Sequence, residues 1–149
     1  MGETVKTEDL VRAIAESFSL KEKDPAEVTP LALAYLGDNV YELVNRYTAV
    51  MEHDLKAREL HRICSGRANA NSQARYAHIL EPLLTEEEHA VFLRGRNAEV
   101  KTAAKNAGIR EYHLATGLEA VVGYLTMKGE YARLTELLKT AWTAGNEEG

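Results

Sequence analysis

The chain has 149 residues, of which 45% are hydrophobic and 28% charged, with 10 glycines and 3 prolines. This is the composition of one globular domain with a real core, and it excludes disordered, collagen-like and repeat proteins. A net charge of −5 argues against binding nucleic acid along the whole chain, so any such binding must come from a local patch. A single cysteine, Cys64, excludes an internal disulfide and favours a reducing, cytoplasmic location. No apolar run is long enough for a membrane span or a secretion signal.

Apolar residues recur at helical spacing almost everywhere, which predicts an all-α fold of about seven helices. Thr29 followed by Pro30 predicts a capped start for the longest helix, Asp54 predicts a cap for the next one, and Thr85 with Glu88 forms a capping box. Gly66 is expected to end or bend the third helix. The helices are expected at 7–18, 30–50, 54–66, 69–80, 85–95, 111–127 and 130–143. Residues 96–110 are interpreted as a loop, and 145–149 as a frayed tail.

The helix at 30–50 has two contrasting faces. One is an apolar arc that we expect to be buried, formed by Leu33, Leu36, Val40, Leu43, Val44 and Tyr47. The opposite stripe contains Asp38 and Glu42, which would ordinarily be solvated carboxylates. Gly37 costs about 1 kcal/mol relative to alanine inside a helix. Its presence beside Asp38 predicts that another part of the chain approaches the backbone closely.

The helix at 111–127 raises the same question for Glu119. Its core stripe is expected to be Leu114, Leu118, Val121, Val122 and Leu125. Glu119 lies among small and apolar neighbours, and from the pattern alone two readings are equally good. It is either an edge residue whose carboxylate reaches water or a partly buried functional group.

Two segments carry a family resemblance. Residues 33–43 (LAYLGDNVYEL) resemble the signature helix of the ribonuclease III catalytic domain, and residues 118–125 (LEAVVGYL) resemble its second acidic helix. The resemblance extends over residues 30–138. The segment RGRNA at 94–98, followed by a loop that contains lysine, is similar to the small bacterial branch known as Mini-ribonuclease III.

The resemblance implies an α-helical, homodimeric, Mg²⁺-dependent endonuclease that cuts double-stranded RNA. Asp38 and Glu119 match the family's metal ligands and would therefore be both catalytic and metal-binding. Ala34 and Thr116 stand where the family has two further carboxylates, so only half of the acidic set is present. The resemblance therefore leaves open whether one or two metal ions bind at each site. The chemistry agrees, because two carboxylates at about 4 Å repel by roughly 4 kcal/mol at an effective dielectric of 20, which a cation would relieve. Mg²⁺ keeps several waters, so two carboxylates are a sufficient protein contribution.

No segment after the last helix matches the family's usual double-stranded-RNA-binding domain, so the catalytic domain itself must hold the RNA. Residues 94–110 contain five basic residues and one acidic residue. We expect RNA binding there, by Arg94, Arg96, Asn97, Lys101 and Lys105. Residues 56–75 have the same balance and include Asn69, Asn71, Ser72 and Gln73 as possible sugar or phosphate donors. A solvated pair of helices explains this second segment at least as well.

The predicted function is that of an endoribonuclease acting on double-stranded parts of precursor 23S ribosomal RNA and leaving 5′-phosphate and 3′-hydroxyl ends. The ribosomal substrate and the ends rest on the resemblance alone. The main alternative is a protein that keeps the fold and binds RNA or assists ribosome assembly without cutting, as Ala34 and Thr116 suggest. A third alternative is a helical protein adaptor, which the acidic composition would also suit.

Overall fold

The structure is a computed structural model that describes residues 9–98 and 108–148. Across these residues it contains helices and no strands, which confirms the all-α prediction. The elements in chain order are α2 (Leu10–Ser17), η1 (Pro25–Glu27), α3 (Pro30–Glu52), α4 (Ala57–Ala68), α5 (Ala70–Leu80), η2 (Glu81–Leu83), α6 (Glu86–Arg96), α7 (Ile109–Met127) and α8 (Tyr131–Glu148). None of the described helices is long and apolar enough to cross a bilayer.

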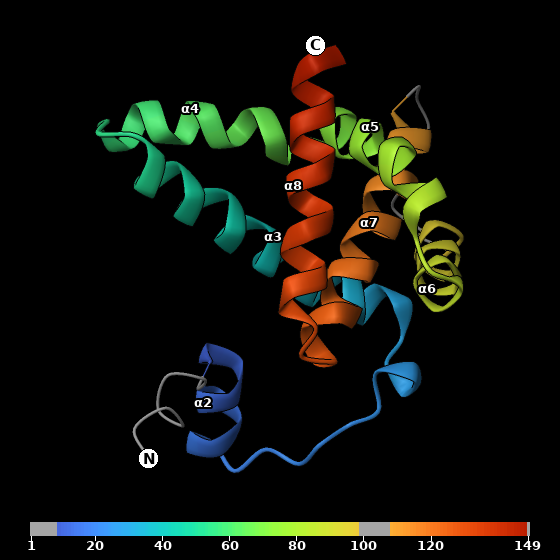
Figure 1. The fold of residues 1–149 in the computed structure, drawn as a ribbon. Coiled ribbons are helices and arrows are strands. Elements are labelled where there is room, and N and C mark those ends of the chain that lie inside the picture. Colours follow the sequence, from blue (N-terminus) through green and yellow to red (C-terminus); the bar gives the residue numbers. More distant parts are fainter. Residues whose placement is uncertain (1–8, 99–107, 149) are drawn as a thin grey trace.

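Helix α7 is the centre of the molecule (Figure 1). It packs against α3, α5, α6 and α8, and almost every residue from Leu114 to Thr126 is buried. The predicted core stripe on this helix is confirmed, since all five of its members are buried. A helix that is covered on all sides needs apolar or small residues all round, which explains the glycines, alanines and valines that surround Glu119.

Helices α3 and α7 touch through their backbones. A Cβ added to Gly37 would collide with the carbonyl oxygen of Glu119, and one added to Gly123 would collide with the carbonyl oxygen of Leu33. The close approach predicted from Gly37 is therefore confirmed, and the segment that approaches is the Glu119 turn of α7. This contact places Asp38 next to Glu119.

The buried face of α3 differs from the predicted arc. Leu43 and Tyr47 are 53% and 62% exposed, whereas the buried residues are Leu33, Ala34, Gly37, Tyr41, Asn45 and Ala49. The prediction holds for Leu33, and Val40 and Val44 pack against the core, but it was wrong for Leu43 and Tyr47. The backbone contact with α7 requires small residues on the inner face. Tyr41 and Asn45 are tolerated inside because each finds hydrogen-bond partners there. The Tyr41 hydroxyl donates to the carbonyl of Arg67 and accepts from Trp142 Nε1, at 2.7 and 3.1 Å, and Asn45 Nδ2 donates to the carbonyl of Cys64.

Side-chain caps were predicted with mixed success. Thr29 Oγ1 accepts from the amide of Ala32, and Thr85 and Glu88 form the predicted capping box. Asp54 does not cap α4, which begins after Lys56 with no side-chain cap. Gly66 does not end α4 either, since the helix continues to Ala68 and Asn69 then caps α5.

The predicted loop and tail are shorter than expected. Arg96 is the last residue of α6, and Arg110 lies in the first turn of α7. Helix α8 passes the expected end near Thr143 and reaches Glu148, so the expected frayed segment 145–149 begins inside a helix. Gly145 is buried, and a Cβ there would lie 2.6 Å from the Tyr76 ring. The contact with Tyr76 explains why the helix continues.

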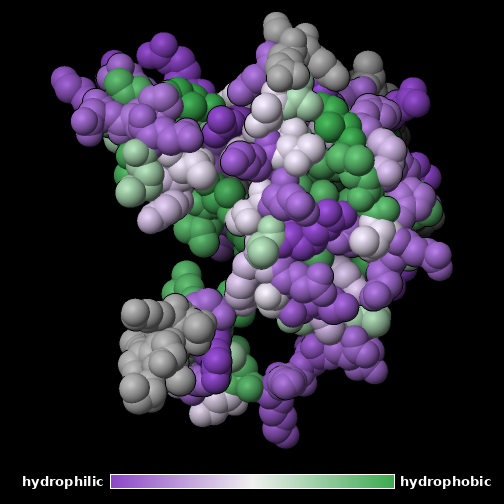
Figure 2. Space-filling view, in the orientation of Figure 1, coloured by the Kyte–Doolittle hydropathy of each residue, from purple (hydrophilic) through white to green (hydrophobic). Residues whose placement is uncertain are grey.

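Helix α2 stands apart from the bundle on an extended connection (Figure 1). Asp9 caps it by accepting from the amide of Arg12, and the same carboxylate accepts from the Tyr131 hydroxyl at 3.1 Å. Its apolar residues Leu10, Ile14 and Phe18 are exposed. Figure 2 shows hydrophobic surface on α2 and along α3.

Candidate active site

Asp38 from α3 and Glu119 from α7 meet where the two helices touch. Their side chains are hydrogen-bonded to one another, with Asp38 exposed and Glu119 partly buried. The two residues are 81 positions apart in the sequence, and the Gly37 contact is what brings them together. The structure thus places side by side the two carboxylates that the sequence singled out.

Burial raises the pKa of Glu119 to about 8, and its hydrogen bond with Asp38 and the negative charges of Asp38 and Glu42 act in the same direction. A hydrogen bond from Gln73 opposes them by favouring the charged form. Without a cation, Glu119 therefore keeps its proton near neutral pH, as expected of a carboxyl group held beside other carboxylates in a partly desolvated place.

Gln73 on α5 is the member of this site that the sequence did not reveal. Only 2% of the residue is exposed, and its side chain is hydrogen-bonded to Glu119. We had grouped Gln73 and Ser72 with possible RNA donors, but both are buried in the protein, and Asn69 is used as a helix cap. No local signal separates an inward-facing glutamine from a surface one, since this depends on how α5 packs on α7.

Glu42, one turn after Asp38, contributes a third negative charge close to the pair. Its Oε1 atom is buried and has no hydrogen-bond partner within the described residues. The Nε atom of Arg46 lies 3.6 Å from it, an ion pair on one side only. A buried carboxylate oxygen with no partner other than this ion pair, next to the Asp38 and Glu119 carboxyl groups, is a setting that a divalent cation would relieve.

These donors fit a magnesium ion. No group of three or more histidine, cysteine, aspartate or glutamate side chains gathers in the described ranges, so the protein would supply Asp38 and Glu119, with water completing the shell. Ala34 and Thr116, where the resemblance implied two further carboxylates, are both buried, and the Thr116 hydroxyl donates to the carbonyl of Tyr112. Neither residue offers a free ligand.

The predicted RNA-binding residues are partly visible. Arg94 and Asn97 are exposed at the end of α6, and Arg96 Nε donates to Asn97 Oδ1 at 3.2 Å. Basic side chains in a last turn also stabilise a helix through its dipole. Lys101 and Lys105 lie outside the described residues.

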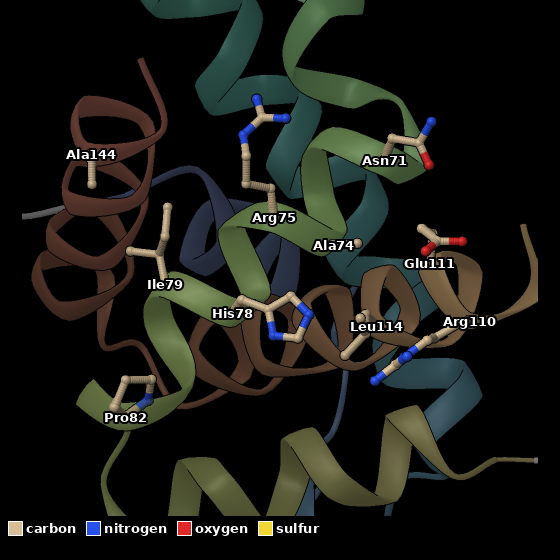
Figure 3. A pocket seen from close by; sticks show the side chains of 10 residues that line it. All are labelled: Asn71, Ala74, Arg75, His78, Ile79, Pro82, Arg110, Glu111, Leu114 and Ala144. Atoms are coloured by element: carbon tan, nitrogen blue, oxygen red, sulfur yellow. The ribbon is translucent and has the colours of Figure 1, made fainter. Parts of the chain in front are cut away.

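The second basic segment, 56–75, divides into residues with different tasks. Arg67 lies over the ring of Trp142, 4.6 Å from its centroid, and so takes part in packing. Asn71 and Arg75 instead line a hollow of about 880 Å³ together with His78 of α5 and Arg110, Glu111 and Leu114 of α7 (Figure 3). We refer to this feature as the α5–α7 hollow.

Other chemically suggestive residues have structural explanations. Cys64 is buried, its Sγ lies 3.7 Å from the carbonyl oxygen of Asn45, and burial raises the pKa of the thiol, so it is not a nucleophile. His89 pairs with Glu81 at 2.9 Å, and Glu88 belongs to the capping box.

Comparisons with known proteins identify relatives of the chain. The ribonuclease III domain family matches residues 31–130. The Mini-ribonuclease 3 of Clostridium tetani is 39% identical over 127 residues, covering 85% of this chain and 83% of that one. That of Symbiobacterium thermophilum is 42% identical over 118 residues, covering 79% and 91%.

One solved structure has the same fold. The crystal structure of protein FN1578 from Fusobacterium nucleatum superposes with a TM-score of 0.74 at 24% identity, covering 83% of this chain and 98% of that one. The sequence matches carry the family assignment, and the acidic pair lies within the matched range. The chain belongs to the ribonuclease III family of endoribonucleases, in its Mini-ribonuclease 3 branch.

Proposed function

We propose that this protein cuts double-stranded RNA in a Mg²⁺-dependent reaction, with Asp38 and Glu119 as the catalytic and metal-binding residues. The observation that carries the proposal is the Asp38–Glu119 pair, which two touching helix backbones hold together and in which Glu119 is protonated near neutral pH when no cation is bound. Without a cation, carboxylates would repel a phosphodiester, because both groups are negatively charged. The pair makes chemical sense as a cation site.

The side chains divide the work in the proposed mechanism. Asp38 and Glu119 would hold the cation, and Glu119 would give up the proton that its burial retains near neutral pH. Gln73 holds the Glu119 carboxylate through its hydrogen bond and favours its charged form. A bound divalent cation supplies Lewis-acid activation of the attacking water and offsets charge on the leaving 3′ oxygen. The products would carry 5′-phosphate and 3′-hydroxyl ends.

We also propose that the protein works as a homodimer. The outward face of α3 exposes large apolar side chains, which a monomer in water would not ordinarily present together. They are Leu31, Tyr35, Leu43, Tyr47, Val50 and Met51. A second copy that covers this face would bury it around a two-fold axis.

The substrate would be double-stranded precursor 23S ribosomal RNA in the cytoplasm, held by Arg94, Arg96, Asn97, Lys101 and Lys105. A-form RNA offers a wide minor groove with 2′-hydroxyls, so contacts from such residues select duplex shape over sequence. The names of the Mini-ribonuclease 3 relatives support an RNA substrate.

The test is to incubate the purified protein with a long RNA duplex, with Mg²⁺ and with EDTA, beside single-stranded RNA of the same sequence. We expect the duplex to be fragmented with Mg²⁺ but not with EDTA. End-labelling of the fragments should show 5′-phosphates. Binding without fragmentation at any metal concentration would instead identify an RNA-binding protein that has lost its activity.

A further inference from the structure

The α5–α7 hollow joins two basic segments that are separate in the sequence. Arg75 and Asn71 come from residues 56–75, and Arg110 comes from residues 94–110. Each segment alone could be a solvated helix face. Their meeting at one concave place is a property of the fold, because α5 packs along α7.

The side chains around the hollow leave positive charge available. Arg75, His78 and Arg110 are exposed, and neither arginine forms an ion pair with any residue that the structure describes. Arg75 lies 5.3 Å from the ring centroid of Tyr76, a contact that leaves its N–H groups open to a ligand. Glu111 is the one acidic residue of the lining, against two arginines and a histidine.

The shape favours an extended ligand over a single small anion. Figure 3 shows the polar ends of Asn71, Arg75, His78 and Arg110 spread around Ala74 and Leu114 rather than gathered at one point. A volume of about 880 Å³ is also much larger than one phosphate group requires. Spaced cationic donors around an apolar floor fit a polyanionic backbone.

The hollow is built by the same two helices as the acidic pair. Helix α5 carries Gln73 toward Glu119 and Arg75 toward the hollow, while α7 carries both Glu119 and Arg110. The hollow therefore lies on the same two helices as the acidic pair but on another face of them, since Arg75 follows Gln73 by two residues and Arg110 precedes Glu119 by nine. We propose that the α5–α7 hollow binds the phosphodiester backbone of the RNA substrate away from the cleaved bond, through Arg75 and Arg110 with Asn71 and His78. This inference rests on the proposed function, because it assigns a second contact to the same substrate.

The first test measures binding of a 30-base-pair RNA duplex by fluorescence anisotropy in Ca²⁺, over a series of KCl concentrations. Each phosphate contact contributes about one to the slope of log affinity against log salt. We expect the double variant Arg75→Ala, Arg110→Ala to lower the magnitude of this slope by about 2 relative to wild type. The matched control is Lys23→Ala, Lys139→Ala, which removes the same charge from exposed residues outside the hollow and should leave the slope within about 0.5 of wild type.

A second test locates the RNA directly. Because Cys64 is buried, a photo-crosslinking maleimide will label a cysteine introduced at the surface. His78→Cys carries the reagent in the hollow, and Lys139→Cys carries it on the exposed side of α8. We expect RNA crosslinks from position 78 and not from position 139.

Equal slopes for the hollow and control variants, or no crosslink from position 78, would overturn the inference. The proposed function is scored separately, by cleavage of the same duplex with the wild-type protein in Mg²⁺. If either of these results is obtained while the wild-type protein still cleaves the duplex, this inference alone is rejected and the proposed function stands.

Discussion

At the scale of single residues, the site is defined by what each carboxylate faces. Glu119 is desolvated by the central position of α7 and opposed by Asp38, while Gln73 supplies the compensating hydrogen bond. Glu42 adds a buried oxygen that has an ion pair with Arg46 but no hydrogen-bond partner within the described residues. The same environment that suits a cation is costly without one, which makes the acidic pair testable by both activity and stability.

Asp38→Asn and Glu119→Gln should each abolish cleavage while leaving the fold intact, because each keeps the side-chain volume and removes one metal ligand. Activity on duplex RNA and thermal unfolding by circular dichroism are the two measurements. Cleavage by either variant within a few-fold of wild type would refute the assignment of that residue.

The raised pKa of Glu119 predicts a pH-dependent stability in EDTA. The folded state keeps a proton that the unfolded chain releases above its ordinary pKa of 4.5, so stability should fall as the pH rises from about 4.5 to about 8. Glu119→Gln removes this titration. Urea unfolding across the range should therefore show a smaller loss for Glu119→Gln than for wild type, and parallel curves would contradict the prediction.

Gln73→Met should weaken metal binding by about 10-fold, the lower end of the effect of losing a residue that orients a metal ligand. Methionine keeps the approximate volume but cannot donate to Glu119. Mn²⁺ binding followed by electron paramagnetic resonance would measure the change without reference to activity. Unchanged affinity in a correctly folded variant would show that Gln73 serves packing alone.

At the scale of elements, the backbone contact between α3 and α7 decides where the site is. Gly37 and Gly123 allow the contact from opposite sides, and a partly buried ion pair between Arg133 and Glu88, at 2.9 Å, ties α8 to α6. The acidic pair is therefore positioned by main chain and by neighbouring helices, with little freedom to adjust.

Gly37→Ala should destabilise the protein by about 1–3 kcal/mol, or more, because the new methyl group cannot fit without separating the two helices. Gly66→Ala is the matched control, since a Cβ there meets nothing within 4 Å and α4 should gain roughly 1 kcal/mol of helix propensity. Denaturant unfolding of both variants compares them. Equal effects of the two substitutions would mean that the contact is looser than described.

The same contact marks the boundary between what the sequence predicts and what it leaves open. Periodicity and caps located the helices, and the Gly37–Asp38 pair indicated a close approach. Leu43 and Tyr47 were wrongly assigned to the inner face of α3, because helix periodicity ranks residues by hydrophobicity whereas backbone contact selects glycine and alanine. Gln73 and the α5–α7 hollow depend on how α5 rotates against α7, and no local pattern records that rotation.

At the scale of the whole molecule, one copy of the chain carries one acidic pair, whereas the proposed RNA duplex has two strands. A two-fold dimer through the exposed face of α3 would present two pairs to antiparallel strands, which are themselves related by an approximate two-fold axis. Double-strand scission would then require both subunits.

A mixed dimer of one wild-type subunit and one Asp38→Asn subunit should therefore nick a single strand. Its product would remain double-stranded on a native gel and show one cut strand on a denaturing gel. Full scission by a verified mixed dimer, or complete inactivity, would exclude one independent site per subunit.

Trp142 is the only tryptophan of the chain, and its position makes it a built-in optical reporter. It is 7% exposed, donates to the Tyr41 hydroxyl, and lies beneath the guanidinium of Arg67. Its emission therefore reports on the junction of α3, α4 and α8. Unfolding of that junction should shift the emission to longer wavelength as the indole meets water. Because the signal is intrinsic to the chain, unfolding can be followed without an added dye and separately from ligand binding at the acidic pair.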